Sequence, residues 1–233
     1  MVDFRVAPEL PSLEILEPFK QASAADFPDQ KRVFVLASNL DISDADRPKV
    51  TTSTPEVKGY TCWAADRRRV VQARVNGFSF SHLPPYNQWS VLRDDARAWW
   101  NKYRDLTRPE GVTRCALRFI NRLELPLPMR DLSDYLRTLP EISRDLPQTL
   151  SGLFMRLVVP FGSTATAIIT QAVDDAAVTP QKLPVILDID VFRDVVLAPD
   201  REDDLWTCME ELRTVKNDVF FKSLTPEGLK LFT

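Results

Sequence analysis

The chain has 233 residues, of which 44% are hydrophobic, 9% aromatic and 27% charged. This composition excludes a disordered or fibrous protein, and a chain of this length can bury a sizeable core without disulfides. Thirty lysines and arginines against 33 acidic residues give a net charge of −3, so no overall basic excess points to nucleic acid. Eighteen prolines against six glycines argue against glycine-rich phosphate loops.

The three cysteines, Cys62, Cys115 and Cys208, are odd in number and far apart. This spacing fits neither a disulfide framework nor a zinc site. The N-terminus runs into acidic residues and prolines rather than an apolar segment, and the longest apolar runs are strand-sized. We therefore expect a cytoplasmic protein with no membrane span, no metal and no cofactor.

Residues 1–57 are expected to form an N-terminal arm, a helix and a first strand. Prolines favour extended backbone and helix breaks, and Pro18 is expected to interrupt the helix. The predicted elements are an extended arm or short edge strand over 1–12, a helix over 13–25, a strand over 33–42 and a loop over 43–57.

Residues 58–233 are expected to form the main domain as one compact unit, with two similar halves over 58–125 and 131–233. Asn76-Gly77 is a strong hairpin signal within the first half. Because neighbouring strands of a meander pair antiparallel, we predict an α+β fold with a large antiparallel sheet and long helices packed on it. The predicted strands span 59–64, 69–75, 78–82, 112–125, 152–160, 165–173 and 183–192, and the long helices span 87–106 and 201–221.

Two helix starts carry capping residues. Asp131 is expected to cap a short helix over 132–139, and Thr225 followed by Pro226 is expected to cap a final turn.

Aromatic residues of the helix over 87–106 follow one helical face, which is most simply explained by packing in the core. Trp99 and Trp100 are adjacent, so we expect that only one of them faces inward. The other, with Trp100 as the candidate, is then available to anchor a partner.

Several strings mark a resemblance to a known family. They read GFSFSxLPPY from Gly77, RFINR from Arg118 and LDIDVF from Leu187, with shorter matches around Arg69 and Lys216. In this combination and order, the strings resemble a sporadically distributed family of uncharacterised prokaryotic proteins over residues 58–232. Residues 1–57 match the family poorly. The resemblance supports the fold prediction and implies no activity.

The predicted strand over 112–125 places three arginines on one face. Strand alternation puts Arg114, Arg118 and Arg122 on the side opposite Cys115, Leu117 and Phe119. One interpretation is a solvated face balanced by acidic residues on neighbouring strands. Another is an anion or nucleic-acid surface, extended by Arg74 and Arg156, and a third is a surface for a protein partner.

Asp188 and Asp190 point to one face of the strand over 183–192, while Leu187, Ile189 and Val191 point to the core. Two such carboxylates could share a metal ion in a phosphoryl-transfer site. We favour the alternative that they pair with the arginines. The prediction is that at least one of Arg114, Arg118, Arg122 and Arg156 lies within ion-pair distance of Asp188 or Asp190.

Two single polar residues complete the candidates. Asn121 lies among apolar residues, so its amide is expected to tie down a loop or a helix end, with ligand binding as the alternative. His82 is the sole histidine, and no Gly-x-Ser-x-Gly elbow accompanies it, which argues against a catalytic triad.

These observations favour a non-enzymatic binding protein that recognises another protein, as an antitoxin, immunity protein or chaperone does. The alternative is a nucleic-acid or phosphate-binding protein, including a metal-dependent phosphoryl-transfer enzyme that uses Asp188 and Asp190. A further interpretation is a homo-oligomer assembled through edge strands.

Overall fold

The computed structural model describes the chain except for residues 36–37, 42–48, 53, 86–87, 149–151 and 233. Nine strands form an antiparallel sheet in the order β2-β5-β6-β7-β1-β8-β11-β10-β9, and β3 pairs with β4 separately. The predicted α+β fold is confirmed.

The strands are β1 (Val2–Val6), β2 (Asp29–Val35), β3 (Ser38–Asp41), β4 (Lys49–Thr52), β5 (Glu56–Trp63), β6 (Arg69–Arg74), β7 (Gly77–His82), β8 (Val112–Pro126), β9 (Phe154–Phe161), β10 (Ala165–Val173) and β11 (Lys182–Leu197). The helices are α1 (Glu17–Ser23), α2 (Trp89–Thr107), α3 (Glu202–Ser223) and α4 (Pro226–Leu229).

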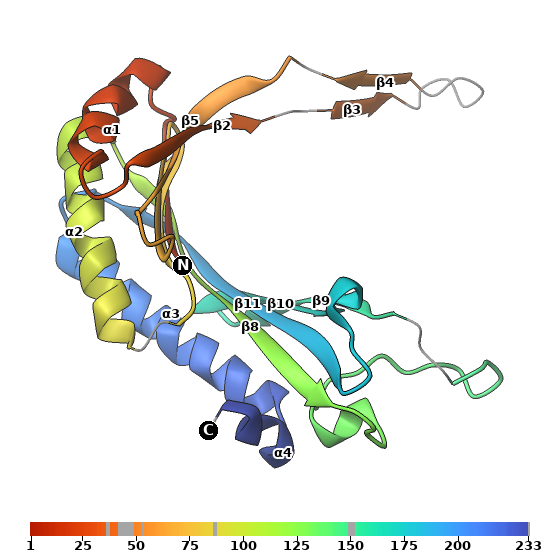
Figure 1. Ribbon diagram of the computed structural model, residues 1–233. Coiled ribbons are helices and arrows are strands. Elements are labelled where there is room, and N and C mark those ends of the chain that lie inside the picture. Colours follow the sequence, from red (N-terminus) through yellow and green to blue (C-terminus); the bar gives the residue numbers. More distant parts are fainter. Residues whose placement is uncertain (36–37, 42–48, 53, 86–87, 149–151, 233) are drawn as a thin grey trace. The chain divides into compact units, whose positions relative to one another are not determined.

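The chain divides into two compact units. Unit 1 comprises Met1–Arg114 and Val195–Arg201, and unit 2 comprises Cys115–Asp194 and Glu202–Thr233. Both units combine antiparallel strands with a long helix, which is α2 in unit 1 and α3 in unit 2 (Figure 1).

Strand β1 lies inside the sheet of unit 1. It pairs antiparallel with β7, with Val2 opposite Phe80 and Phe4 opposite Phe78, and β8 follows it in the strand order. The expectation of an extended arm or edge strand at the N-terminus is therefore wrong. The physical reason is the alternation of Val2, Phe4 and Val6, whose side chains are all buried.

Trp99 and Trp100 of α2 are both buried, so the expectation that only one faces inward is wrong. Trp100 packs edge-on against Phe4 of β1, with ring centroids 4.9 Å apart. Trp99 packs at the same centroid distance against Phe27, which follows α1. Helix α2 contacts both β7 and α1, and this gives it two buried sides instead of one.

The N-terminal helix and the following loop differ from the prediction. The region predicted as one helix is a 3₁₀ turn over Leu13–Leu16 followed by α1. Pro18 lies in the first turn of α1, where the missing N–H costs no helical bond, so it helps to start α1. The region predicted as a loop contains β4, while residues 43–48 and 53 lie outside the described part.

Unit 2 has an aliphatic core between its sheet and α3. Leu187, Ile189 and Val191 of β11 are fully buried, and so are Met209 and Leu212 of α3. Helix α3 contacts β10, and its buried residues include Leu205, Met209, Leu212 and Val219.

The two predicted caps are present in unit 2. The Asp131 carboxylate accepts the Ser133 N–H at 2.7 Å, although the helix it starts has only three residues, Leu132–Asp134. The Thr225 hydroxyl accepts the Gly228 N–H at 3.1 Å at the start of α4. No helix in the described ranges has the length and hydropathy required to cross a membrane.

Candidate functional site

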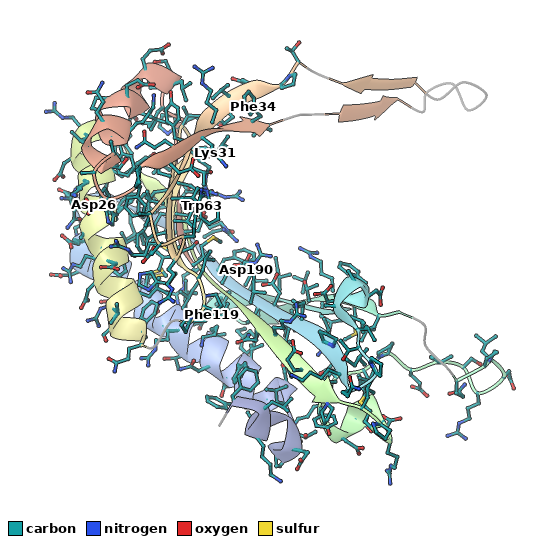
Figure 2. All side chains as sticks on the ribbon, viewed as in Figure 1. Asp26, Lys31, Phe34, Trp63, Phe119 and Asp190 are labelled. Atoms are coloured by element: carbon teal, nitrogen blue, oxygen red, sulfur yellow. The ribbon has the colours of Figure 1, made fainter. Side chains whose placement is uncertain are left out.

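Alternation along β8 and β11 separates two faces of the sheet in unit 2. Phe119 faces α3, and the ammonium of Lys216 on α3 lies 4.1 Å from the centre of its ring. Asp190 lies on the other face of the sheet (Figure 2). We call this second face the open face of unit 2. Its members are Arg118, Ile120, Arg122, Phe154, Arg156, Val158, Thr170, Asp188 and Asp190.

Arg118 and Asp188 form the central ion pair of the open face. The Arg118 Nε donates to both carboxylate oxygens at 2.9 and 3.1 Å, and Nη2 donates to Oδ2 at 2.5 Å. The hydrogen bonds to Asp188 raise the pKa of Arg118, and the nearby charge of Asp190 adds to this. The prediction that one of the arginines pairs with Asp188 or Asp190 is therefore confirmed.

The other two arginines of β8 also have acidic partners. Arg122 donates to Glu124 at 2.6 Å and to Asp174 at 2.7 Å, on the open face. Arg114 lies in unit 1, where its Nη1 is 3.4 Å from an Asp3 carboxylate oxygen. The three arginines thus share a strand face but belong to separate charge networks.

Arg156 differs from these arginines. It lies opposite Thr170 of β10, which lies opposite Asp188 of β11, so the three residues form one row across the open face. Its side chain is exposed, and it has no ion-pair partner among the described residues.

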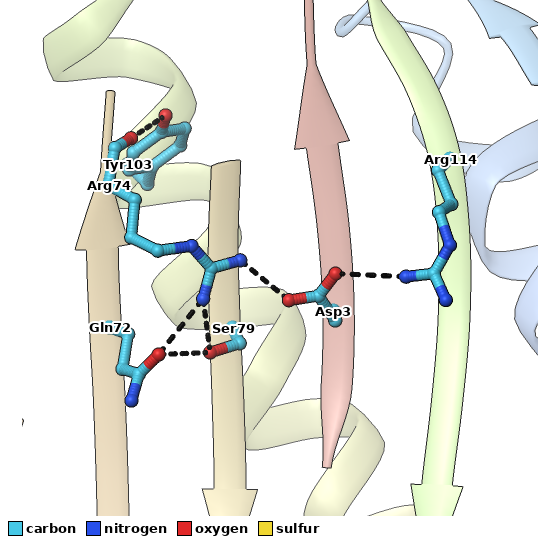
Figure 3. Close-up of polar contacts among 6 residues, drawn as sticks. All are labelled: Asp3, Gln72, Arg74, Ser79, Tyr103 and Arg114. Carbon is cyan, nitrogen blue, oxygen red and sulfur yellow. Dashed lines mark hydrogen bonds and ion pairs between the residues drawn. The ribbon is translucent and has the colours of Figure 1, made fainter. Parts of the chain in front are cut away.

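Figure 3 shows the network that contains Arg114. Asp3 of β1 accepts from Arg74 Nη2 at 2.6 Å, and it also faces Arg114. Arg74 donates further to Gln72 at 2.9 Å and to Ser79 at 3.3 Å. The charged side chains of this cluster are 10–18% exposed, so the carboxylate of Asp3 compensates positive charge that is largely buried. Sequence reasoning included Arg74 but missed Asp3, because no local pattern connects β1 with β8.

Asn121 connects two strands of unit 2. Its Nδ2 donates to the carbonyl oxygen of Leu187 on β11 at 3.0 Å. The expectation that it ties down a loop or helix end is wrong, because its satisfied partner is the backbone of another strand. Trp100 lies in the core of unit 1 and is inaccessible to a partner.

The open face carries large apolar side chains that sequence reasoning missed. Phe154 is 76% exposed, Ile120 59% and Val158 55%. Phe154 and Val158 alternate with Arg156 on β9, and Ile120 lies between Arg118 and Arg122 on β8. The sequence of β9 could have indicated these exposed side chains, because Arg156 is its only charged residue and apolar residues occupy most positions on both faces.

The candidate catalytic groups are dispersed. His82 Nε2 lies 2.9 Å from Asp95 Oδ2 in unit 1. Within the described ranges, no three side chains of His, Cys, Asp or Glu gather in a way that could hold a metal ion. Asp188 is engaged by Arg118 and does not join Asp190 in a larger carboxylate group.

Comparisons of the chain with protein-family models, with curated proteins and with solved structures find no match. The resemblance to the sporadically distributed prokaryotic family therefore stays a prediction.

Proposed function

We propose that the protein is a non-enzymatic binding protein that recognises another protein through the open face of unit 2. The observation that carries this proposal is the exposure of Ile120, Phe154 and Val158 on one face of a sheet. Large apolar side chains exposed among polar groups on one face are typical of protein-binding sites.

The charges of the open face are consistent with a protein partner. Arg118 and Arg122 are held by Asp188, Glu124 and Asp174, and these pairs fix the side chains between the apolar groups. A guanidinium that already binds a carboxylate is poorly placed to bind phosphate as well. The pairing therefore weighs against the alternative of a nucleic-acid or phosphate surface.

We propose that this chain acts on its partner as an antitoxin, an immunity protein or a chaperone does. We also propose that it is located in the cytoplasm.

The test is affinity capture from nuclease-treated native extract. The baits are the parent protein, Ile120→Glu/Phe154→Glu on the open face, and Val91→Glu on α2 of unit 1 as a control with similar exposure. We expect the parent and the control to retain the same stoichiometric protein, and the double variant to lose it at least tenfold.

Equal retention by the double variant would refute the proposed surface. In a parallel capture from extract without nuclease, recovery of nucleic acid alone, with strong salt dependence and loss in Arg156→Ala, would favour the alternative function.

A further inference from the structure

Strand β9 forms one end of the nine-stranded sheet, so one of its sides has no neighbouring strand in the described part of the chain. Phe154 and Val158 are exposed on the open face, and Met155, Leu157 and Val159 are half-buried on the other face. Apart from Arg156 and Pro160, this edge strand carries only apolar side chains, and it offers unpaired backbone groups together with exposed apolar side chains.

The opposite end of the same sheet is protected. Strand β2 carries Asp29, Lys31 and Arg32, and its pairing register shifts between Val33 and Phe34. Charged side chains and bulges are the usual protection of an edge against pairing with another chain. The two ends therefore differ in their ability to accept a further strand.

We propose that β9 pairs antiparallel with β9 of a second copy of the chain, around a two-fold axis at Val158. A two-fold axis perpendicular to the sheet keeps each residue opposite one from the same face. The strand runs from Phe154 to Phe161, so registers centred on Leu157 or on Val158 give the largest overlap.

The charge of Arg156 selects between these two registers. Centring on Leu157 makes the two Arg156 side chains diagonal neighbours, where like charges repel. Centring on Val158 separates them by four residue positions, about 13 Å along the strand. Because the described chain gives Arg156 no acidic partner, the register centred on Val158 avoids an uncompensated repulsion.

The selected register brings apolar side chains together on both faces. Val158 lies opposite Val158 of the second copy on the open face, and Leu157 lies opposite Val159 on the other face. Pro160 lies opposite Arg156 at two symmetry-related positions, and at each of them its missing N–H removes one backbone hydrogen bond but introduces no charge. The dimer joins the two open faces into one surface, which goes beyond the proposed recognition of another protein.

The first experiment measures molar mass by light scattering after gel filtration, from low to high micromolar concentration. We expect the mass to rise from 26.6 kDa toward about twice that value as concentration increases. Val158→Lys is expected to remain monomeric, because it places two ammonium groups opposite each other. Phe34→Lys on β2 is the matched control and is expected to dimerise like the parent. Circular dichroism checks that each variant is folded.

The second experiment tests the register with single cysteines. Val158→Cys places two thiols opposite each other, whereas Phe154→Cys is more exposed but lies opposite Gly162, beyond the end of β9. Mild oxidation with copper phenanthroline in air should cross-link only Val158→Cys, since the native cysteines are buried.

A monomeric mass at every concentration, or equal cross-linking of the two variants, would overturn the proposal. Ile120→Glu distinguishes a failure of this proposal from a failure of the proposed function. It alters the open face on β8, so it should weaken capture of the protein partner while the molar mass still shows a dimer.

Discussion

The two units use similar elements but distribute their apolar side chains differently. In unit 1, aromatic rings gather between the sheet and α2, where Phe4, Phe78 and Trp100 are fully buried. In unit 2, the core against α3 is mainly aliphatic, while Ile120 and Phe154 remain exposed on the open face. Unit 1 thus has the denser aromatic core, and unit 2 carries exposed apolar side chains on its open face.

The charge network of unit 1 is also more deeply buried than that of unit 2. Asp3 in unit 1 faces two guanidinium groups that are largely buried, whereas Asp188 in unit 2 holds Arg118, whose side chain is 41% exposed. Because a buried charge cannot be compensated by water, the network of unit 1 is expected to be the more sensitive to loss of its carboxylate.

The largest effect should come from the aromatic core of unit 1. Trp100→Ala is expected to lower the free energy of unfolding by about 3–5 kcal/mol, because it leaves a large cavity among rings. Trp100→Phe should cost less, since the buried indole N–H has no hydrogen-bond partner among the described residues. Denaturant unfolding measures both variants, and a loss below about 1 kcal/mol for Trp100→Ala would contradict this account.

The matched change in the core of unit 2 is Leu212→Ala on α3. Leu212 is fully buried, so we expect a loss of about 2–4 kcal/mol. Val215→Ala, at a half-buried position of the same helix, is the control and should cost clearly less. Similar losses in both variants would mean that α3 packs through a different face.

Removal of each central carboxylate compares the two charge networks. Asp3→Ala should cost about 2–4 kcal/mol because it removes a carboxylate that faces two largely buried guanidinium groups. Asp188→Ala should cost about 1 kcal/mol, since water can solvate the exposed part of Arg118. Thermal and denaturant unfolding at neutral pH measure the loss of stability in both variants. A larger loss of unfolding free energy in Asp188→Ala than in Asp3→Ala would contradict the expected difference between the two networks.

The smallest expected effect is pH-dependent and concerns Lys216. Burial, with a smaller contribution from Arg213, lowers the pKa of Lys216 to about 8 from an ordinary value of 10.5. Between these values the unfolded chain binds more protons, so this residue makes the free energy of unfolding rise with pH. Below about pH 8 the cost of its buried charge is fully present.

Lys216→Met should therefore stabilise the protein by about 1 kcal/mol at pH 7, a value reduced for partial exposure, and should flatten the rise between pH 8 and 10.5. Lys222→Met, at an exposed position of α3, is the control and should leave the pH profile unchanged. An unchanged slope in Lys216→Met would show that its ammonium is solvated in the folded protein.

The sequence by itself determined the elements whose pattern is local. Alternation along β8 and β11 predicted which side chains face the core, and it led to the pairing of Arg118 with Asp188. The hairpin of β6 and β7, the long helices and the cap at Thr225 were predicted for the same reason, although the turn consists of Val75 and Asn76 and not of Asn76 and Gly77. Each of these signals extends over a few residues, and backbone geometry converts it directly into structure.

Only the tertiary structure decided which strands lie at the ends of the sheet and which side chains a second layer covers. β1 lies inside the sheet, and its Asp3 meets Arg114, which is 111 residues away in sequence. Helix α2 buries both Trp99 and Trp100 because α1 packs beside it, which the periodicity of α2 could not indicate. The apolar edge of β9 is exposed for the same physical reason: strand order depends on pairing between distant segments, and local sequence patterns do not encode it.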